Sequence, residues 1–362
     1  MEYSRNTRER LVRHSQCYPG LQPTDVFKYL FQSALGCEHM VASEAKAIEY
    51  IRREYDAVTA EGAADCLPRT ERLDGGYTRV HLSCLDEGLT AETLGRLFCL
   101  SAVSEPNGRE ALEEKLQVAR ELAKAGEFPF SADAFEEALA VWRENGCPAV
   151  HHSRAFREAY RPAYRVIANR YAAFLSLFTR IDALMRNGLA VVALEGGSAS
   201  GKTTLSGILE TVYGCTVFHA DDFFLRPEQR TRERLSEIGG NLDRERLLSE
   251  VLEPLRRGEP IRYRRFDCSR GELESPVETL PKKLVVVEGA YSMHPELAGY
   301  YDFSVFLDID PVYQRERILA RNSPAFAERF FREWIPLERE YFSHTDVRNR
   351  CDLAFEIRRE SF

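Results

Sequence analysis

The sequence lacks any uninterrupted apolar run of membrane-spanning length, and Met1 to Arg13 contain no apolar stretch like that of a secretory signal. We therefore expect a cytoplasmic protein with no membrane partner. A basic excess is also missing, because the formal net charge is -8, and an acidic chain of this kind is not expected to bind nucleic acid in general. Internal repeats and low-complexity tracts are absent too.

Paired cysteines are likewise missing. The nine cysteines are spread singly, with no Cys-x-x-Cys and no spacing typical of a zinc site. An odd number of cysteines in a reducing compartment indicates free thiols, most of them behaving as small buried hydrophobic side chains. Since His39, His81, His151 and His152 include no i, i+4 pair, the sequence gives no support for a histidine metal site.

The length of 362 residues, with 44% hydrophobic and 29% charged residues, allows two domains with separate cores. Apolar spacing predicts a mainly α-helical domain over residues 1–187, followed without a flexible linker by a second domain, 188–362. The last helix of the first domain is expected to begin at Pro162 and to stop at Asn187-Gly188. The Gly75-Gly76 pair predicts a turn in a stretch where strands are only weakly indicated. The other expected helices cover residues 24–36, 43–55, 91–103, 109–125 and 132–145.

After Gly188 short strands alternate with helical stretches. The strands are rich in Val, Leu and Phe, a pattern typical of a parallel sheet that is covered on both faces. The sequence therefore predicts a doubly wound α/β domain with five strands, whose ligands bind beyond the carboxyl ends of the strands. The expected strands are Leu189–Leu194, Thr216–Ala220, Leu284–Val287, Phe303–Leu307 and Leu353–Ile357.

The stretch after the first of these strands carries the clearest functional signal. It matches G-x-x-x-x-G-K-[ST], and the strand before it and the helix after it supply the context that a phosphate-binding loop requires. Glycines let successive backbone N–H groups surround a phosphate, the lysine reaches the outer phosphates, and the threonine hydroxyl coordinates magnesium. A glycine-rich loop that merely packs is the less favoured alternative. The residues predicted to bind ATP are Gly196, Gly197, Ser198, Ala199, Ser200, Gly201, Lys202, Thr203 and Thr204.

Carboxylates follow two further strands. Asp221 comes directly after the second strand, where it is our candidate base for orienting an acceptor hydroxyl toward the terminal phosphate. Asp222 beside it is equally well explained as a helix cap. Glu288 ends the third strand, where it is expected to hold Mg²⁺ together with Thr203 or to touch the acceptor, a structural hydrogen bond being the alternative.

These residues resemble the uridine kinase and phosphoribulokinase group of small-molecule kinases over positions 189–357. The resemblance implies that the loop binds ATP, that Asp221 is the catalytic base, and that Lys202, Thr203 and Glu288 share the site. The histidine that uridine kinases carry after an aromatic-Asp pair is absent, with Gly271 at about its position. The motifs that carry the resemblance are the loop at 196–204, Asp221-Asp222-Phe223-Phe224, Val287-Glu288-Gly289, and Asp308-Ile309-Asp310 with Arg317 and Arg321; by the same resemblance Asp243 and Phe266 fall near the acceptor.

Arginines form two groups in the second domain. One is a basic run that includes Arg264, which is either a solvated face paired with glutamates or a site for an anionic acceptor such as a sugar phosphate. The other comprises Arg317 and Arg321, which lie four residues apart and so share a helix face. We expect one of these two to neutralise charge as the phosphoryl group is transferred.

The sequence thus favours an ATP-dependent, Mg²⁺-requiring kinase that phosphorylates a hydroxyl of a nucleoside or similar small metabolite. Two alternatives stay open. One is a nucleotide-dependent switch whose helical domain binds a protein partner, although no Asn-Lys-x-Asp motif for guanine recognition is present. The other is RNA binding by the helical domain, which the acidic composition disfavours. A homo-oligomer is compatible with the sequence, which does not specify the oligomeric state.

Overall fold

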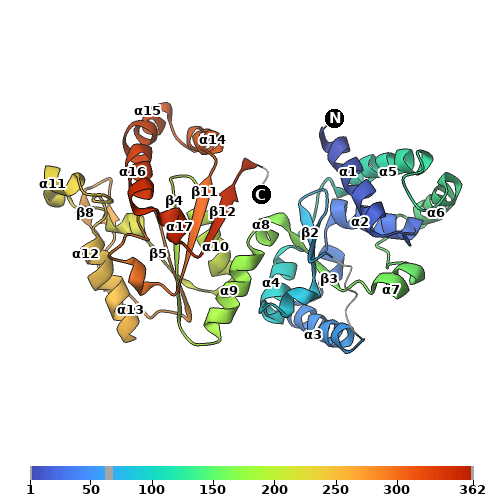
Figure 1. Ribbon diagram of the computed structural model, residues 1–362, viewed down its shortest axis with the longest axis horizontal. Helices are drawn as coiled ribbons and strands as arrows, with labels where there is room; N and C mark the ends of the chain where they lie inside the picture. Colours follow the sequence, from blue (N-terminus) through green and yellow to red (C-terminus); the bar gives the residue numbers. More distant parts are fainter. Residues whose placement is uncertain (1, 62–67, 360–362) are drawn as a thin grey trace. The chain divides into compact units, whose positions relative to one another are not determined.

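The computed structural model describes residues 2–61 and 68–359. They form two compact units, one up to Arg180 and one from Ile181 onward (Figure 1). Within the described ranges, no helix combines the length and the apolar character needed to cross a membrane. Cys66 lies outside these ranges, and the remaining cysteines carry free thiols as expected.

Helices make up most of the first unit, and those predicted before Pro162 are present. Local capping explains several of their starts, because the side chain of Thr90 accepts a hydrogen bond from the Thr93 amide and that of Ser131 accepts one from the Ala134 amide. The helices are α1 (Glu2–Cys17), α2 (Pro23–Leu35), α3 (Glu44–Glu61), α4 (Ala91–Leu100), α5 (Gly108–Lys124), α6 (Ala132–Glu144), α7 (Arg154–Tyr160) and α8 (Asn169–Ala172).

The first unit also contains an antiparallel sheet of three strands in the order β1 (Thr70–Arg72), β2 (Tyr77–His81) and β3 (Tyr164–Ala168). The turn between β1 and β2 lies at the predicted glycine pair. The prediction of a helix beginning at Pro162 is wrong, because the aromatic and β-branched residues of β3 pair along β2 instead. That partner is remote in the sequence, so helical spacing alone could not reveal it. Helical structure resumes at α8 and continues in α9 (Leu175–Met185), which runs across the boundary between the units.

The second unit is built on the predicted parallel sheet. Its five strands lie in the order β12-β11-β4-β10-β5, and every pairing between neighbours is parallel. All residues of β4 and β10 are buried, as expected for central strands covered on both faces. The prediction of a five-stranded α/β fold after a mainly helical region is therefore confirmed. The strands are β4 (Ala190–Gly196), β5 (Thr216–His219), β10 (Leu284–Glu288), β11 (Phe303–Ile309) and β12 (Leu353–Ile357).

Helices and two small hairpins complete the second unit. Val191 and Val285 of the sheet join one buried apolar cluster with Leu247 and Leu255 of α12 and α13. Helix α14 follows the carboxyl end of β11, and α14 to α16 gather near that end of the sheet (Figure 1). The helices are α10 (Lys202–Tyr213), α11 (Arg232–Leu235), α12 (Arg244–Leu247), α13 (Glu253–Arg257), α14 (Pro311–Arg321), α15 (Pro324–Arg329), α16 (Ile335–Thr345) and α17 (Val347–Arg350); the hairpins pair β6 (Ile261–Tyr263) with β9 (Val277–Thr279) and β7 (Phe266–Asp267) with β8 (Glu272–Leu273).

Candidate active site

The predicted phosphate loop connects the end of β4 to the start of α10. Gly196 and Gly201 have φ values of 148° and 102°, in the region that favours glycine, and a Cβ at Gly196 would lie 2.6 Å from the carbonyl oxygen of Leu307. Ala199 between them also has a positive φ, of 61°. The loop thus has the tight backbone and the following helix N-terminus that suit a bound phosphate.

Lys202 is buried at the first position of α10. Its Nζ donates hydrogen bonds to the carbonyl oxygens of Gly196 and Gly197 at 2.8 and 2.9 Å. The hydroxyl of Ser200 in the same loop is fully buried and has no hydrogen-bond partner among the described residues. A buried donor without a partner is costly, so a phosphate oxygen would satisfy a group that this loop leaves open.

Glu288 joins the phosphate loop to the end of β5. Its Oε1 accepts a hydrogen bond from the Thr203 hydroxyl at 2.9 Å and lies 2.7 Å from Nδ1 of His219, its register partner on the neighbouring strand. Burial alone would raise the pKa of Glu288, but the hydrogen bond with His219 and the charge of Lys202 outweigh it and lower that pKa. The same hydrogen bond raises the pKa of His219. Glu288 is therefore an ionised carboxylate beside the loop.

Asp221 and Asp222 follow β5 in a short 3-10 turn and have different surroundings. Asp222 is partly buried, and its Oδ2 lies 3.6 Å from Nε of Arg265. The side chain of Asp221 is open to solvent, yet enough protein surrounds it that desolvation raises its pKa, with the charge of Glu288 acting in the same direction. Asp221 is therefore a solvent-accessible carboxyl group directly after β5, with a raised pKa.

The two predicted arginines lie on α14. Arg317 approaches the phosphate loop, since its Nη1 is 3.6 Å from the position that a Cβ on Gly201 would take. Arg321 has its guanidinium 5.7 Å from the ring centre of Phe330, and its pKa is lowered first by desolvation and then by the charge of Arg317. The structure thus places Arg317 beside the phosphate loop. Arg321 lies close enough to Arg317 for the two positive charges to repel each other.

Three further residues, predicted to lie near the acceptor, contact other parts of the second unit. Asp243 is buried as the N-cap of α12, where it accepts hydrogen bonds from the Arg246 amide and from Nε2 of Gln229. Phe266 is buried in β7, and Arg264 is exposed and donates to the carbonyl oxygens of Leu273 and Glu274. These contacts are internal, and roles in substrate binding stay predictions.

Glu338 is a site residue that sequence reasoning missed. Only 5% exposed on α16, it accepts hydrogen bonds from the amide and the hydroxyl of Ser198, while Gln314 donates to the Ser198 carbonyl at 2.8 Å. Burial raises the pKa of this carboxyl group. No motif marks it in the sequence, because a glutamate on a helix of this composition is usually solvated.

Glu195 is a second missed residue, with a fully buried side chain immediately before the loop. Its carboxylate accepts hydrogen bonds from the amides of Gly196, Tyr291 and Met293 and from the hydroxyl of Tyr341. Burial raises its pKa to about 7 in spite of these donors. The signal was a charged residue at the end of an otherwise apolar strand.

The oxygens of Thr203 and Glu288 suit the predicted magnesium ion, because Mg²⁺ prefers hard oxygen ligands and is held by few protein groups together with water and substrate phosphates. Over the described ranges, no group of three or more His, Cys, Asp or Glu side chains is placed to hold a metal ion. Because Mg²⁺ in proteins usually keeps several waters and binds substrate phosphates, an ion held by Thr203 and Glu288 would draw its other ligands from a nucleotide and from water.

Comparison with known proteins finds relatives of the second unit. Residues 191–323 match the family described as "Phosphoribulokinase / Uridine kinase family", which confirms the resemblance predicted for the C-terminal half. The uridine kinase of Chlamydia pneumoniae is 29% identical over 142 residues, covering 37% of this chain and 62% of the relative. The uridine kinase of Aliivibrio salmonicida is 30% identical over 132 residues, covering 33% and 60%. The phosphoribulokinase of Synechocystis sp. is 28% identical over 129 residues, covering 33% of this chain and 38% of the relative.

These alignments thus span less than two thirds of each of the three relatives. Among solved structures, one described as a possible uridine kinase from Bacillus stearothermophilus is 22% identical, with a TM-score of 0.37, and covers 50% of this chain and 99% of that one.

Proposed function

We propose that the second unit transfers the terminal phosphoryl group of ATP to a hydroxyl of a nucleoside or a related small metabolite. The observation that carries the proposal is the meeting of three strand ends, where the phosphate loop, Glu288 and the open carboxyl group of Asp221 share one edge of the sheet. A base facing the outer phosphate of a bound triphosphate is the minimal arrangement for phosphoryl transfer to an alcohol. The family matched by residues 191–323 consists of enzymes named for such reactions.

Each residue has a role in this proposal. The loop amides and Lys202 hold the phosphates, and Asp221 accepts a hydrogen bond from the acceptor hydroxyl and then its proton. Thr203 and Glu288 would hold Mg²⁺, which when bound neutralises charge on the outer phosphates. Arg317, with Arg321 behind it, stabilises the negative charge that spreads over the transferred group. Lys202 would exchange its hydrogen bonds to Gly196 and Gly197 for bonds to phosphate.

The acceptor is proposed to be a nucleoside because the curated relatives with the broader coverage are uridine kinases. Uridine itself is less favoured than the class, since Gly271 stands about where those enzymes carry a histidine. A sugar phosphate is the other acceptor to include, and Arg264 is the side chain proposed to meet its phosphate.

The test is an assay of acceptor-dependent ADP formation with ATP and Mg²⁺. The acceptors are a panel of nucleosides, nicotinamide riboside, pantothenate and sugar phosphates, and the phosphorylated product is identified by mass. We expect one class of acceptor to be phosphorylated by the wild type and not by Lys202→Ala. The control is Lys283→Ala, which removes an exposed lysine of the same unit.

Full activity of Lys202→Ala would contradict the proposal. ATP binding without turnover of any acceptor would also contradict it, and would shift support to a nucleotide-dependent switch.

A further inference from the structure

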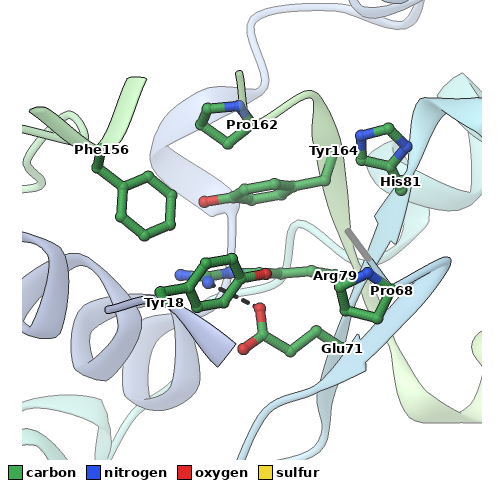
Figure 2. Close-up of a pocket in the computed structure, with 8 residues that line it drawn as sticks. All are labelled: Tyr18, Pro68, Glu71, Arg79, His81, Phe156, Pro162 and Tyr164. Carbon is green, nitrogen blue, oxygen red and sulfur yellow. Dashed lines mark hydrogen bonds and ion pairs between the residues drawn. The ribbon is translucent and has the colours of Figure 1, made fainter. Parts of the chain in front are cut away.

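The antiparallel sheet of the first unit has a narrow recess on one face and a wide cavity on the other. In the recess, Arg79 lies against the Tyr164 ring and is paired with Glu71 (Figure 2). The inner space there is about 20 Å³, enough for one water molecule. Arg165 follows Tyr164 on β3, so its side chain points to the opposite face of the sheet. It lines a cavity of about 700 Å³, a volume typical of small-molecule sites.

Helix α3 forms one wall of this cavity. Its lining residues recur at intervals of three and four and so share one face of the helix; they are Ala47, Tyr50, Arg53, Glu54 and Ala57. The two alanines are small and leave room beside the helix, while Tyr50 is 46% exposed. Met40, which also lines the cavity, is 42% exposed. Large apolar side chains that remain accessible around a cavity favour a ligand with an apolar body.

Arg165 is the buried polar group of the cavity and is only 7% exposed. Its Nη1 donates hydrogen bonds to Oε2 of Glu54 at 2.7 Å and to the carbonyl oxygen of Tyr164 at 2.9 Å. Its Nε and Nη2 make no hydrogen bond to the described residues, yet they are not among the nitrogen atoms that are shut off from solvent. This edge of the guanidinium is therefore accessible from the cavity that Arg165 lines. Its two parallel N–H groups match the two oxygens of a carboxylate.

The charged side chains that line the cavity leave one positive charge for a ligand. Glu54 balances Arg165 through their ion pair. Arg53 is exposed, lies 4.7 Å from the ring centre of Tyr50, and makes no ion pair with the residues that the structure describes. A ligand with a single negative charge would neutralise this excess, whereas an amine would be repelled. A phosphate monoester, with about 1.5 to 2 negative charges, would exceed it and meet Glu54.

We propose that this cavity binds an amphipathic monocarboxylate, whose carboxylate accepts hydrogen bonds from Nε and Nη2 of Arg165. The apolar body of the ligand lies along Met40, Tyr50 and Phe98, which line the same cavity. The site belongs to the first unit and is independent of the proposed phosphotransferase activity. It gives the N-terminal unit a ligand-binding function.

The test is a calorimetric and ligand-observed NMR titration of the full chain with octanoate and 3-phenylpropionate. Four matched compounds separate charge from apolar body: 1-octanol has no charge, octylamine has the opposite charge, octyl phosphate has a larger negative charge, and acetate has no apolar body. We expect at least one of the two carboxylates to bind with a dissociation constant of about 1 mM or lower. 1-Octanol and octyl phosphate should bind at least about tenfold more weakly, and octylamine and acetate should not bind.

Two variants test the site itself. Arg165→Gln should weaken binding of the carboxylate at least about tenfold and leave the weak binding of 1-octanol unchanged, a difference that a merely structural role of Arg165 would not produce. Ala57→Trp, an exposed change on α3, should weaken carboxylate binding at least about tenfold by filling the cavity. The control is Arg154→Gln, which removes an exposed arginine of α7 that is paired with Glu158. It should bind the carboxylate as the wild type does.

Circular dichroism of each variant separates loss of the ligand site from loss of the fold. Ala57→Trp keeps the test decisive if Arg165→Gln fails to fold. The proposal is overturned if neither carboxylate binds the wild type at millimolar concentration, if 1-octanol or octyl phosphate binds as tightly as octanoate, or if either folded variant binds the carboxylate as well as the wild type.

Discussion

The carboxylate of Glu338 is bound to Ser198 of the phosphate loop, with Oε2 2.9 Å from the Ser198 amide nitrogen and Oε1 2.6 Å from its hydroxyl. A buried negative group from α16 thus uses donors of the loop that is proposed to bind a triphosphate. The contact has two opposing effects. It stabilises the loop, but the negative charge of Glu338 repels the triphosphate that the loop is proposed to bind.

Replacing Glu338 with Gln should therefore tighten ATP binding. Removing a like charge from the edge of the loop is expected to lower the dissociation constant about five- to tenfold at low salt, and added salt should reduce the effect. The variant should unfold at a lower denaturant concentration, since an amide is a weaker partner for Ser198. Calorimetric titration with ATP and urea denaturation measure the two effects.

Glu340→Gln is the matched control, because Glu340 lies on the same helix with an exposed side chain. Its ATP affinity should equal that of the wild type. The affinity difference between wild type and Glu338→Gln should also shrink as the pH is lowered and Glu338 itself becomes protonated. Weaker ATP binding by Glu338→Gln would mean that the contact with Ser198 shapes the loop more than its charge opposes the nucleotide.

Asp221→Asn should separate the base from the neighbouring Asp222. An amide keeps the shape but cannot accept the proton of the acceptor hydroxyl, so we expect kcat to fall about 10²- to 10⁴-fold with little change in ATP affinity. Asp222→Asn is the control, since Asp222 lies beside Arg265 and is partly buried. Steady-state kinetics with the acceptor found in the panel would measure both variants. Equal losses in the two variants would remove Asp221 from its proposed role.

Arg317→Ala should slow transfer about 10²- to 10³-fold, because it removes the guanidinium nearest the loop. The loss should fall mainly on kcat if Arg317 acts on charge that develops during transfer. Arg315→Ala, two residues earlier on α14, is the control, since Arg315 is exposed and stacks on Phe331 at 4.5 Å. Single-turnover rates compare the variants directly. A kcat unchanged in Arg317→Ala would exclude it as the stabilising arginine.

Much of the second unit was predictable because its signals are local. The two central strands, β4 and β10, are apolar up to their last residues, and the loop motif requires a strand before it and a helix after it, as observed for β4 and α10. In the first unit β1 and β2 were only weakly indicated, and β3 escaped prediction, because its signal is not local. The residues Tyr164–Ala168 form a strand only because Tyr77–His81 lies beside them, and Pro162 favoured a helix start.

Part of the candidate site was also predictable from local signals, and part was not. Lys202 belongs to a motif, and Asp221 and Glu288 stand at the ends of strands, so the order of the elements predicts that these three residues lie close together. The contact of Glu338 with Ser198 joins residues 140 positions apart, and no spacing rule connects them. His219 was passed over although it precedes Asp221 by two residues, because its register with Glu288 depends on the pairing of β5 with β10.

Glu195 should make the stability of the second unit depend on pH. Burial raises its pKa from 4.5 to about 7 in the folded state, the nearby amides and the Lys202 charge opposing it only in part. Between these two pKa values the folded state binds more protons than the unfolded state, so the free energy of unfolding falls as the pH rises from 4.5 to 7. The contribution is fully present below pH 4.5 and lost above pH 7, and it amounts to about 3 kcal/mol.

Glu195→Gln removes this titration and should flatten the pH dependence over that range. The chain has two tryptophans, Trp142 in the first unit and Trp334 in the second, so a Trp142→Phe background makes Trp334 fluorescence report on the second unit alone. Urea unfolding of this background with and without Glu195→Gln, at several pH values from 5 to 8, gives the difference in slope. Other titrating groups are common to both proteins and cancel. The control is Glu210→Gln, an exposed change on α10, which should leave the pH dependence of the unfolding free energy unchanged. If Glu195→Gln also left that pH dependence unchanged, Glu195 would titrate outside this range.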